Sequence, residues 1–367
     1  MAVYKIFPTA DATLYSRFPV KNTGLDEILE VSAKNNASAI NYSVDVNPGA
    51  VLSYDDIRRS VVLFSDADLN TIKSYTTGSW KTGLKLYLAN AENLSTTYSL
   101  EIRQVSSSWQ MGTGKNADYP ETINGVSWYN PNAYVTATNY WPNPSYFLTP
   151  GGGNWTNTFT TQSYTYKDPK DINVDVTSIV DNWFSGSQNN GFLLKHPTSV
   201  ENSSGSFIAL NFFSVDTHTI YPPTLEMKWD DSSYTTGSLS VLNNSDFILS
   251  LENNMGTYKY DTGKYRFRIN ARDKYPVRTF TTSSVYTVNK ALTRQSYWSL
   301  QDVKSEEIIV DFDTTYTKIS CDGNTSYFDL YMKGLEPERY YKILIRTVLP
   351  TSESIDVDND YIFKIIR

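Results

Sequence analysis

The sequence predicts an all-β protein organised in two domains. Short runs rich in β-branched and aromatic residues recur along the whole chain, and several of them alternate apolar with polar residues, as antiparallel strands with one buried face do. Gly, Pro, Asn and Ser separate these runs. Aromatic residues make up 14% of the chain, with 28 tyrosines, and only 19% is charged. This composition suits half-buried strands better than helices.

Strand-like runs define the first domain, and a polar segment ends it. The expected strands lie at 58–64, 84–89, 98–105, 191–196, 206–213 and 224–229. After the last of them, the sequence DDSSYTTGS has no apolar anchor. We therefore predict an N-terminal domain over 1–231, a linker at 232–238 and a β-rich C-terminal domain over 239–367.

One segment breaks the β-pattern. In INVDVTSIVDNWFSG (172–186), Val176, Ile179, Val180 and Trp183 follow the i, i+3, i+4, i+7 spacing of an amphipathic helix. Asp175 or Thr177 can cap its N-terminus, and Gly186 suits the positive φ at which a helix ends. Its polar face holds no catalytic pair, so we expect one short helix that buries its apolar face on the core.

Charge and targeting signals exclude several classes of function. A net charge of −7 without any Lys/Arg run argues against nucleic-acid binding. Cys321 is the only cysteine, so no intrachain disulfide is expected. The N-terminus has no secretory signal pattern, and no apolar run approaches the length of a membrane span. The expectation is a protein made in the cytoplasm that does not insert into membranes.

The sequence offers no catalytic motif and no nucleotide cradle, so we expect a protein without enzymatic activity and without a cofactor. His196 and His218 stand apart from any zinc or nucleophile pattern and are expected to be structural. An enzyme such as a polysaccharide depolymerase would need carboxylates that converge from separate strands. The one metal candidate is a calcium site between strands with Asp11 and Asp216, and turn or cap roles are the alternative for both residues.

A long irregular stretch, 106–163, is rich in tryptophan. Long aromatic loops on a β-domain often bind ligands, but their rings also anchor loops to their own core. In the first case, the contacts to a glycan or a protein partner are expected from Trp128, Tyr129, Trp141 and Trp155, since aromatic faces match the apolar faces of sugar rings.

The ordered segments of the N-terminal part resemble the DNRLRE-type domain, a β-sandwich similar to carbohydrate-binding modules that occurs in secreted bacterial proteins and in phage structural proteins. The matching residues are Arg59, Phe64, Asp175, Val176, Thr177, Trp183, Asn190, Gly191 and Phe192. Ser65 stands where the family usually has an aspartate. The resemblance covers residues 5–230 and implies a jelly-roll sandwich.

The second part carries GLEPERYYKILIRT (334–347), which resembles the tyrosine-corner strand of fibronectin-III and immunoglobulin-like sandwiches, with Tyr340 or Tyr341 at the corner. The combination of both domains resembles virion proteins of tailed phages, particularly phages of marine bacteria. This implies a structural protein of the tail, baseplate or neck that contacts other virion proteins in several symmetric copies. The alternative is a carbohydrate-binding module that attaches to a host-surface glycan.

Overall fold

The computed structural model describes residues 2–34, 56–92, 97–133, 140–141, 151–201, 208–276 and 287–367. In these residues strands dominate and pack in sandwich-type layers, which confirms the all-β prediction. None of the helices in these ranges is long and apolar enough to cross a membrane.

The chain forms two compact units, and each is assembled from separate stretches. Unit 1 contains residues 1–5, 75–81 and 227–367, and unit 2 contains 6–74 and 82–226. The chain therefore passes between the units four times. A division at the predicted linker 232–238 would give only one such passage. Two residues of that linker form strand β13 (Tyr234–Thr235), which pairs in parallel with Cys321 and Asp322 inside unit 1.

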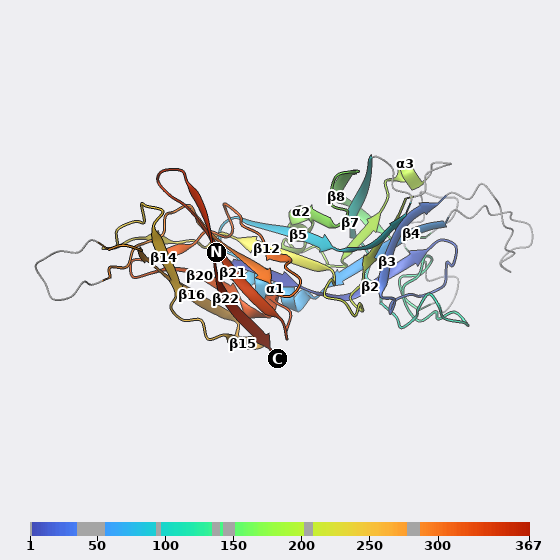
Figure 1. Ribbon diagram of the computed structural model, residues 1–367. Coiled ribbons are helices and arrows are strands. Elements are labelled where there is room, and N and C mark those ends of the chain that lie inside the picture. Colours follow the sequence, from blue (N-terminus) through green and yellow to red (C-terminus); the bar gives the residue numbers. More distant parts are fainter. Residues whose placement is uncertain are drawn as a thin grey trace, which may run out of the picture. The chain divides into compact units, whose positions relative to one another are not determined.

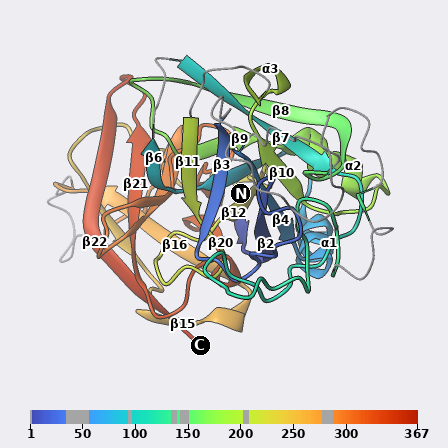
Figure 2. The same cartoon turned by 90° about the vertical axis from the view of Figure 1, so that its right-hand side faces the viewer.

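Unit 2 is built on a sheet of eight strands. Seven of them follow the order β6-β11-β3-β4-β10-β7-β8, and β2 also pairs with β4 (Figure 2). Their bounds are β2 (Pro8–Tyr15), β3 (Ile28–Lys34), β4 (Asp56–Phe64), β6 (Leu88–Glu92), β7 (Thr97–Val105), β8 (Trp155–Thr165), β10 (Phe192–Lys195) and β11 (Ile208–Phe213). The pairings β2–β4, β3–β4, β4–β10, β10–β7 and β7–β8 are antiparallel.

Both faces of the central strands β4 and β10 are covered, so nearly all of their residues are buried. Leu193 of β10 pairs with Val61, and both belong to the apolar cluster under the tryptophan-rich segment. Phe192, the neighbour of Leu193 in β10, points to the opposite face of the sheet. Its ring meets those of Phe64 and Trp183 at centroid distances of 6.0 and 4.9 Å. Successive side chains of one strand thus pack into two separate apolar layers, one on each face of the sheet.

A second sheet has the order β1-β12-β5-β9. Its strands are β1 (Ala2–Ile6), β12 (Thr224–Trp229), β5 (Trp80–Leu86) and β9 (Ile172–Asp175). The predicted strand 84–89 is thus divided, because β5 ends at Leu86 and β6 begins at Leu88. The predicted strand 224–229 coincides with β12.

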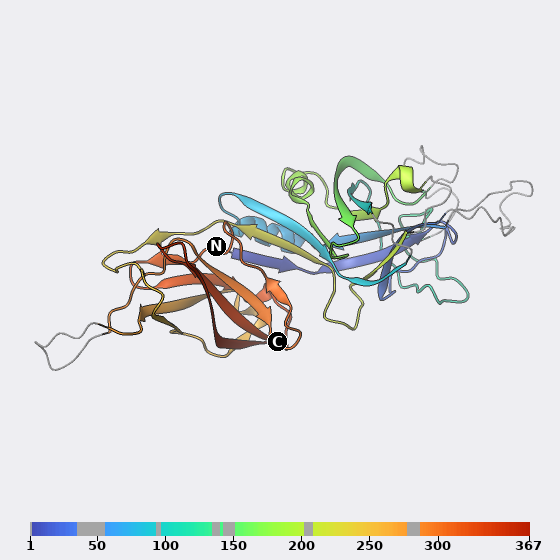
Figure 3. The ribbon, with the colours of Figure 1, turned by 45° about the horizontal axis from the view of Figure 1, so that its top comes forward.

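The predicted amphipathic helix is confirmed as α2 (Thr177–Phe184), seen as the green coil in Figure 3. Ile179, Val180 and Trp183 are its buried residues. Of the two predicted capping residues, Asp175 bonds to the first turn of the helix, because its carboxylate accepts the Thr177 N–H at 2.9 Å. Gly186 follows the helix with φ +112°, as predicted. The helix therefore belongs to the core of unit 2.

The sequence predicted a single helix, but the described residues also contain α1 (Asp66–Tyr75) and α3 (Thr198–Glu201). In α1 only Leu69 and Ile72 are buried, too few to give a recognisable apolar stripe. Ser65 accepts the Asp68 N–H through its hydroxyl at 3.4 Å. Serine is among the residues that cap helices well, so Ser65 suits the start of α1.

Unit 1 contains a sandwich of two five-stranded sheets (Figure 1, Figure 3). One sheet has the order β13-β19-β20-β16-β14 and the other β15-β22-β21-β17-β18. The bounds are β14 (Phe247–Leu251), β15 (Thr257–Lys259), β16 (Lys264–Asp273), β17 (Ser296–Asp302), β18 (Ile308–Val310), β19 (Ser320–Asp322), β20 (Ser326–Tyr331), β21 (Tyr340–Val348) and β22 (Ser354–Ile366), with 3₁₀ turns at Tyr260–Thr262 and Met332–Gly334.

The core of unit 1 lies between these sheets, where Trp298 stacks on Phe328 with ring centroids 4.9 Å apart. Tyr341 is 2% exposed and its hydroxyl donates to the Glu336 carbonyl at 3.0 Å, whereas Tyr340 is 53% exposed. Tyr341 is therefore the residue that ties the loop before β21 to its strand, as a tyrosine corner does.

Candidate functional site

The tryptophan-rich segment covers one face of the eight-stranded sheet and closes a core of its own. Trp109, Trp128 and Trp141 are buried there against β2, β4 and β10 residues such as Leu14, Val61 and Leu193. The indole N–H of Trp109 donates to the Asn190 carbonyl at 2.9 Å, and that of Trp141 donates to the Ser127 carbonyl at 3.0 Å. These three rings hold the segment to the sheet.

The four aromatic residues predicted to contact a ligand therefore fall into two groups. Trp128 and Trp141 are each only 2% exposed, so a ligand cannot stack on them while the segment stays in place. Tyr129 is partly buried and meets Tyr140 edge-to-face at 5.5 Å. Trp155 is partly exposed and begins β8, where it lies beside charged residues of the neighbouring strands.

Asn22 holds the segment at a second point. Its side-chain amide donates to the carbonyls of Met111 and Val126 at 2.6 and 2.8 Å, and its oxygen accepts the Gly114 N–H at 2.8 Å. A Cβ at Gly112 would lie 2.3 Å from the Asn22 side-chain oxygen, so only glycine permits this approach. Asn22 thus fixes three points of the segment from one buried position.

A buried ion cluster lies on the same face of the sheet as Trp155. Arg59 (β4) forms two hydrogen bonds with the Glu201 carboxylate (α3), at 3.1 and 2.9 Å, and Lys195 (β10) lies 3.2 Å from the same carboxylate. The three side chains are 0–1% exposed. Burial opposes ionisation of Glu201, but both cations outweigh it and hold its pKa below the usual value. Burial lowers the pKa of Lys195, and Glu201 opposes this shift.

Aromatic rings enclose this cluster. The Arg59 guanidinium lies 4.9 Å from the ring centroid of Trp128 and 5.2 Å from that of Trp155, positions in which a cation is attracted to the ring face. The guanidinium also donates to the Gly152 carbonyl at 2.8 Å. Gly152 has φ +77°, and a Cβ there would lie 2.4 Å from the Arg59 Nη1. The GGG sequence at 151–153 therefore lets the chain pass between Trp128 and Arg59.

Glu101, Arg103, Trp155 and Phe159 border the cluster, and we call these four residues the β8 platform. The side chains of Arg103 and Glu101 are only 15% and 13% exposed. Arg103 (β7) donates to Glu101 at 2.7 Å and lies over Phe159 at 4.3 Å and Trp155 at 5.8 Å. Phe159 is 46% exposed. The platform presents aromatic faces next to a fixed guanidinium–carboxylate pair. Such a surface can stack on a planar or sugar ring and can also anchor a protein partner.

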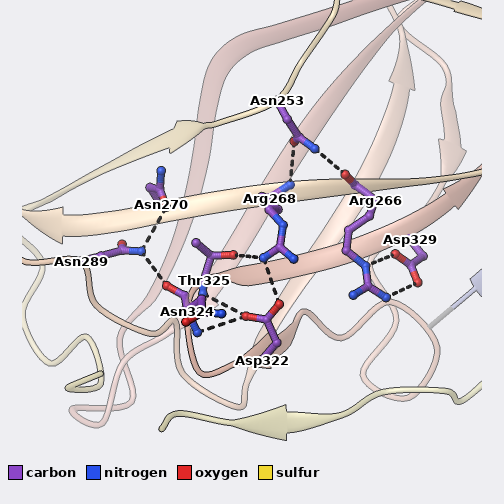
Figure 4. A network of polar contacts seen from close by, with 9 residues as sticks. All are labelled: Asn253, Arg266, Arg268, Asn270, Asn289, Asp322, Asn324, Thr325 and Asp329. Carbon is purple, nitrogen blue, oxygen red and sulfur yellow. Dashed lines mark hydrogen bonds and ion pairs between the residues drawn. The ribbon is translucent and has the colours of Figure 1, made fainter. Parts of the chain in front are cut away.

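Unit 1 carries a second polar surface on the outer face of the β13-β19-β20-β16-β14 sheet (Figure 4). Arg266 binds Asp329 through two hydrogen bonds, at 2.8 and 3.0 Å, and lies 3.9 Å over the Tyr327 ring. Arg268 donates to Asp322 at 2.9 Å and to Thr325 at 2.7 Å. The side chains of Arg266 and Arg268 are 41% and 32% exposed, so these ion pairs orient two guanidinium groups on an open sheet face.

Asparagines fix the backbone behind this surface. The Asn253 side chain accepts the Arg268 N–H at 3.0 Å and donates to the Arg266 carbonyl at 2.7 Å, and so continues the pairing of β16 beyond the end of β14. Asn289 donates to Asn270 at 3.0 Å and to the Asn324 carbonyl at 3.1 Å. Figure 4 shows both asparagines and both arginines around the same strand, β16.

The predicted calcium ligands Asp11 and Asp216 lie close to each other, although more than two hundred residues separate them in the chain. The Val215 N–H donates to Asp11 at 2.7 Å. Burial raises the pKa of Asp11 to about 8, and the negative charge of Asp216 adds to this shift. One oxygen of each carboxylate is buried without a hydrogen bond among the described residues.

These two carboxylates supply fewer ligands than calcium takes, since it binds six to eight oxygens. In the described ranges, His, Cys, Asp and Glu form no group of three or more that fits a metal ion. Backbone oxygens would have to complete the coordination. The calcium site at Asp11 and Asp216 stays a prediction.

The two histidines do not meet. His196 is fully buried next to Lys195, where burial lowers the pKa of the imidazole and the charge of Glu201 opposes that shift. The His218 side chain is 89% exposed and lies 3.7 Å from Glu27. Neither imidazole joins the β8 platform or the surface of unit 1.

Of the residues in the cluster and the β8 platform, sequence reasoning predicted only Trp128 and Trp155 as site residues. It named Arg59 for its resemblance to a family pattern alone, and it missed Lys195, Glu201, Arg103 and Phe159. Lys195 ends an apolar strand, and Glu201 follows it on a single helical turn, so their pairing with Arg59 depends on tertiary structure. One signal was present in GGG at 151–153, which marks a close approach of the backbone to other groups. A comparison with models of known protein families and with curated protein sequences found no match.

Proposed function

We propose that this chain is a non-enzymatic structural protein of a tailed-phage particle, placed in its tail, baseplate or neck, and that it works through contacts with other virion proteins. The observation that carries the proposal is an arrangement of side chains that recurs on two sheet faces. On both, an arginine is held by a carboxylate and stacked on an aromatic ring: Arg103 on Phe159, and Arg266 on Tyr327.

This arrangement suits protein–protein recognition for two reasons. Arginine and aromatic residues dominate the energetic centres of interfaces. Ion pairs that already fix the guanidinium groups reduce the conformational entropy that binding would otherwise cost. The resemblance of the chain to phage virion proteins adds the context of a multi-copy particle.

Mass spectrometry of purified particles tests the proposal directly, since it predicts that the chain is a particle component. Incorporation of the variants Arg266→Ala and Tyr327→Ala should fall, while Lys318→Ala, a cation outside this surface, should be incorporated like the wild type. Absence of the chain from intact particles would refute the structural role.

A second candidate function is glycan binding, which the β8 platform favours. Trp155 and Phe159 lie four residues apart on one strand, with Arg103 and Glu101 beside them to bond sugar hydroxyl groups. A glycan array followed by titration of Phe159→Ala tests it, with Tyr166→Ala as a control that removes an exposed ring outside the platform. Binding that is lost with Phe159 and kept with the control supports glycan recognition. Equal binding by both variants contradicts it.

A further inference from the structure

The sequence between residues 122 and 166 is free of charge. It contains no Asp, Glu, Lys, Arg or His, in a chain whose net charge is −7. The stretch includes all of β8, and it exposes aromatic side chains at Tyr140 (39%), Phe159 (46%) and Tyr166 (70%). Two copies of a negatively charged chain repel each other, and this repulsion is weakest where both present a neutral surface.

β8 is also an end strand of its sheet. β7 pairs with it on one side, and no strand of the described ranges pairs with it on the other. End strands usually carry lysine, proline or an inward charge that prevents pairing with other chains. β8 has none of these over Trp155–Thr165, and the first charged residue after it is Lys167.

The pairing of β8 with β7 shows which part of this edge strand is regular. Pairing with β7 shifts between Arg103 and Val105, so the N-terminal part of β8 is irregular. From Phe159 to Thr165 the pairing is continuous. Thr161, Ser163 and Thr165 are exposed in this part, while Gln162 is held by hydrogen bonds to the Asp171 carbonyl and the Asn173 N–H.

We propose that residues 159–165 of β8 pair antiparallel with the same residues of a second copy of this chain. Such pairing is isologous, so one uncharged strand meets itself about a two-fold axis. It gives a partner to main-chain groups of Thr160–Tyr164, on the side of β8 where the described ranges hold no strand, while those of Thr165 already bond to Asp168 and Lys170. It also places Thr161 and Ser163 opposite each other, and threonine and serine are favourable cross-strand neighbours. The proposal goes beyond the proposed function and does not depend on it, because the contact forms between isolated chains.

Sedimentation velocity over chain concentrations of about 5 to 500 µM tests the pairing, a range suited to a small interface. The wild type should change from one chain to two as concentration rises. Ser163→Lys should stay a single chain, because the two-fold axis at residue 162 makes the two lysines diagonal neighbours on one face of the paired strands. Thr161→Lys gives an independent second variant, and circular dichroism verifies that each variant is folded.

The control is Asn90→Lys on β6, the strand at the other end of the same sheet. It gives the chain the same net charge as Ser163→Lys, and both variants are less negative than the wild type, so overall repulsion alone would favour their association. Loss of the two-chain species in Ser163→Lys and its retention in Asn90→Lys supports the β8 contact. A wild type that remains a single chain, or two lysine variants that behave alike, overturns it.

Discussion

Burial raises the pKa of Asp11 to about 8, so the folded state of unit 2 keeps a proton there that the unfolded chain loses near pH 4. The free energy of unfolding should therefore fall as the pH rises from 4 to 8 and level off above 8, by an amount on the order of 5 kcal/mol for this group. Asp11→Asn removes the ionisable group and should flatten this dependence. Melting curves at several pH values measure how stability depends on pH. The control is Asp181→Asn at an exposed position, which should keep the pH dependence of the wild type.

Calcium binding at Asp11 and Asp216 has its own test. Calcium would replace the missing counter-charge, so at pH 8 millimolar calcium is expected to raise the melting temperature of the wild type and to leave that of Asp11→Asn unchanged. Differential scanning fluorimetry with calcium and with a chelator measures both. Equal curves for the wild type under the two conditions would exclude a calcium site at this pair.

Glu201 neutralises two buried cations, Arg59 and Lys195, which have little access to water. Glu201→Gln should therefore lower the free energy of unfolding by about 3–5 kcal/mol, the cost of leaving a buried charge without its partner. Replacement of all three residues by methionine should recover most of the loss. Chemical denaturation measures both variants, and Glu121→Gln at the surface is the control. An unchanged Glu201→Gln would mean that the cluster is not desolvated.

At the level of single residues, the sequence predicted which side chains could act in a site better than it predicted which residues they contact. Asp11 and Asp216 were placed together as the two carboxylates of a possible calcium site between strands, and they do lie close to each other. The contact of Arg59 with Glu201 could not be inferred, since α3 has one turn and no periodic pattern. Trp128 and Trp141 carry the residue type of a ligand contact, but their burial depends on how the whole segment folds back onto the sheet.

Among the helices, α2 owes its place to one apolar face, and Trp183 is its largest contributor. Trp183→Ala should lower the free energy of unfolding by about 3–5 kcal/mol, because the cavity left against Phe192 adds to the lost burial. Ser178→Ala on the exposed face should change it by less than about 0.5 kcal/mol. Urea unfolding followed by circular dichroism compares them. Equal midpoints for the two variants would contradict the packing role of Trp183.

The contrast between α1 and α2 explains what sequence patterns can reveal about elements. α2 has apolar residues over two turns, a carboxylate at Asp175 that accepts the first N–H of the helix, and Gly186 after its end, so every signal agrees. α1 buries only Leu69 and Ile72, and its start depends on Ser65. The predicted strands were located by apolar residues that recur on at least one of their faces, whereas β8 begins inside the stretch 106–163 that was predicted to be irregular. The division at Tyr87 between β5 and β6 follows from their pairing with different sheets.

For the whole molecule, the arrangement of unit 1 limits where the chain can be cut. Tyr331 meets Tyr4, Tyr75 and Trp229 at ring-centroid distances of 5.5, 5.3 and 5.6 Å, and all three lie outside residues 239–367. Val3 belongs to the same core as Trp298. A domain boundary placed after a polar linker misses such contacts, because composition reports neither the N-terminal strand nor residues 75–81 as part of this unit.

A fragment of residues 239–367 should therefore be markedly less stable than unit 1 in the full chain, since each large apolar side chain it lacks contributes about 1.5–3 kcal/mol by burial. Its melting temperature and its amide NMR spectrum measure this. The matched control is the full chain with a short Gly-Ser insertion after Gly237, which alters the same region but removes nothing. A fragment with the spectrum and stability of the intact unit would show that residues 1–5 and 75–81 are dispensable.

Strand β1 also has a consequence for how the protein is made. Tyr4 leaves the ribosome long before Tyr331, and at ordinary rates of translation the interval is on the order of tens of seconds. During this time the first strand has neither its neighbour β12 nor the ring that packs on it. Unit 1 can close only after most of its residues have been translated, and until then β1 lacks the partners that cover it.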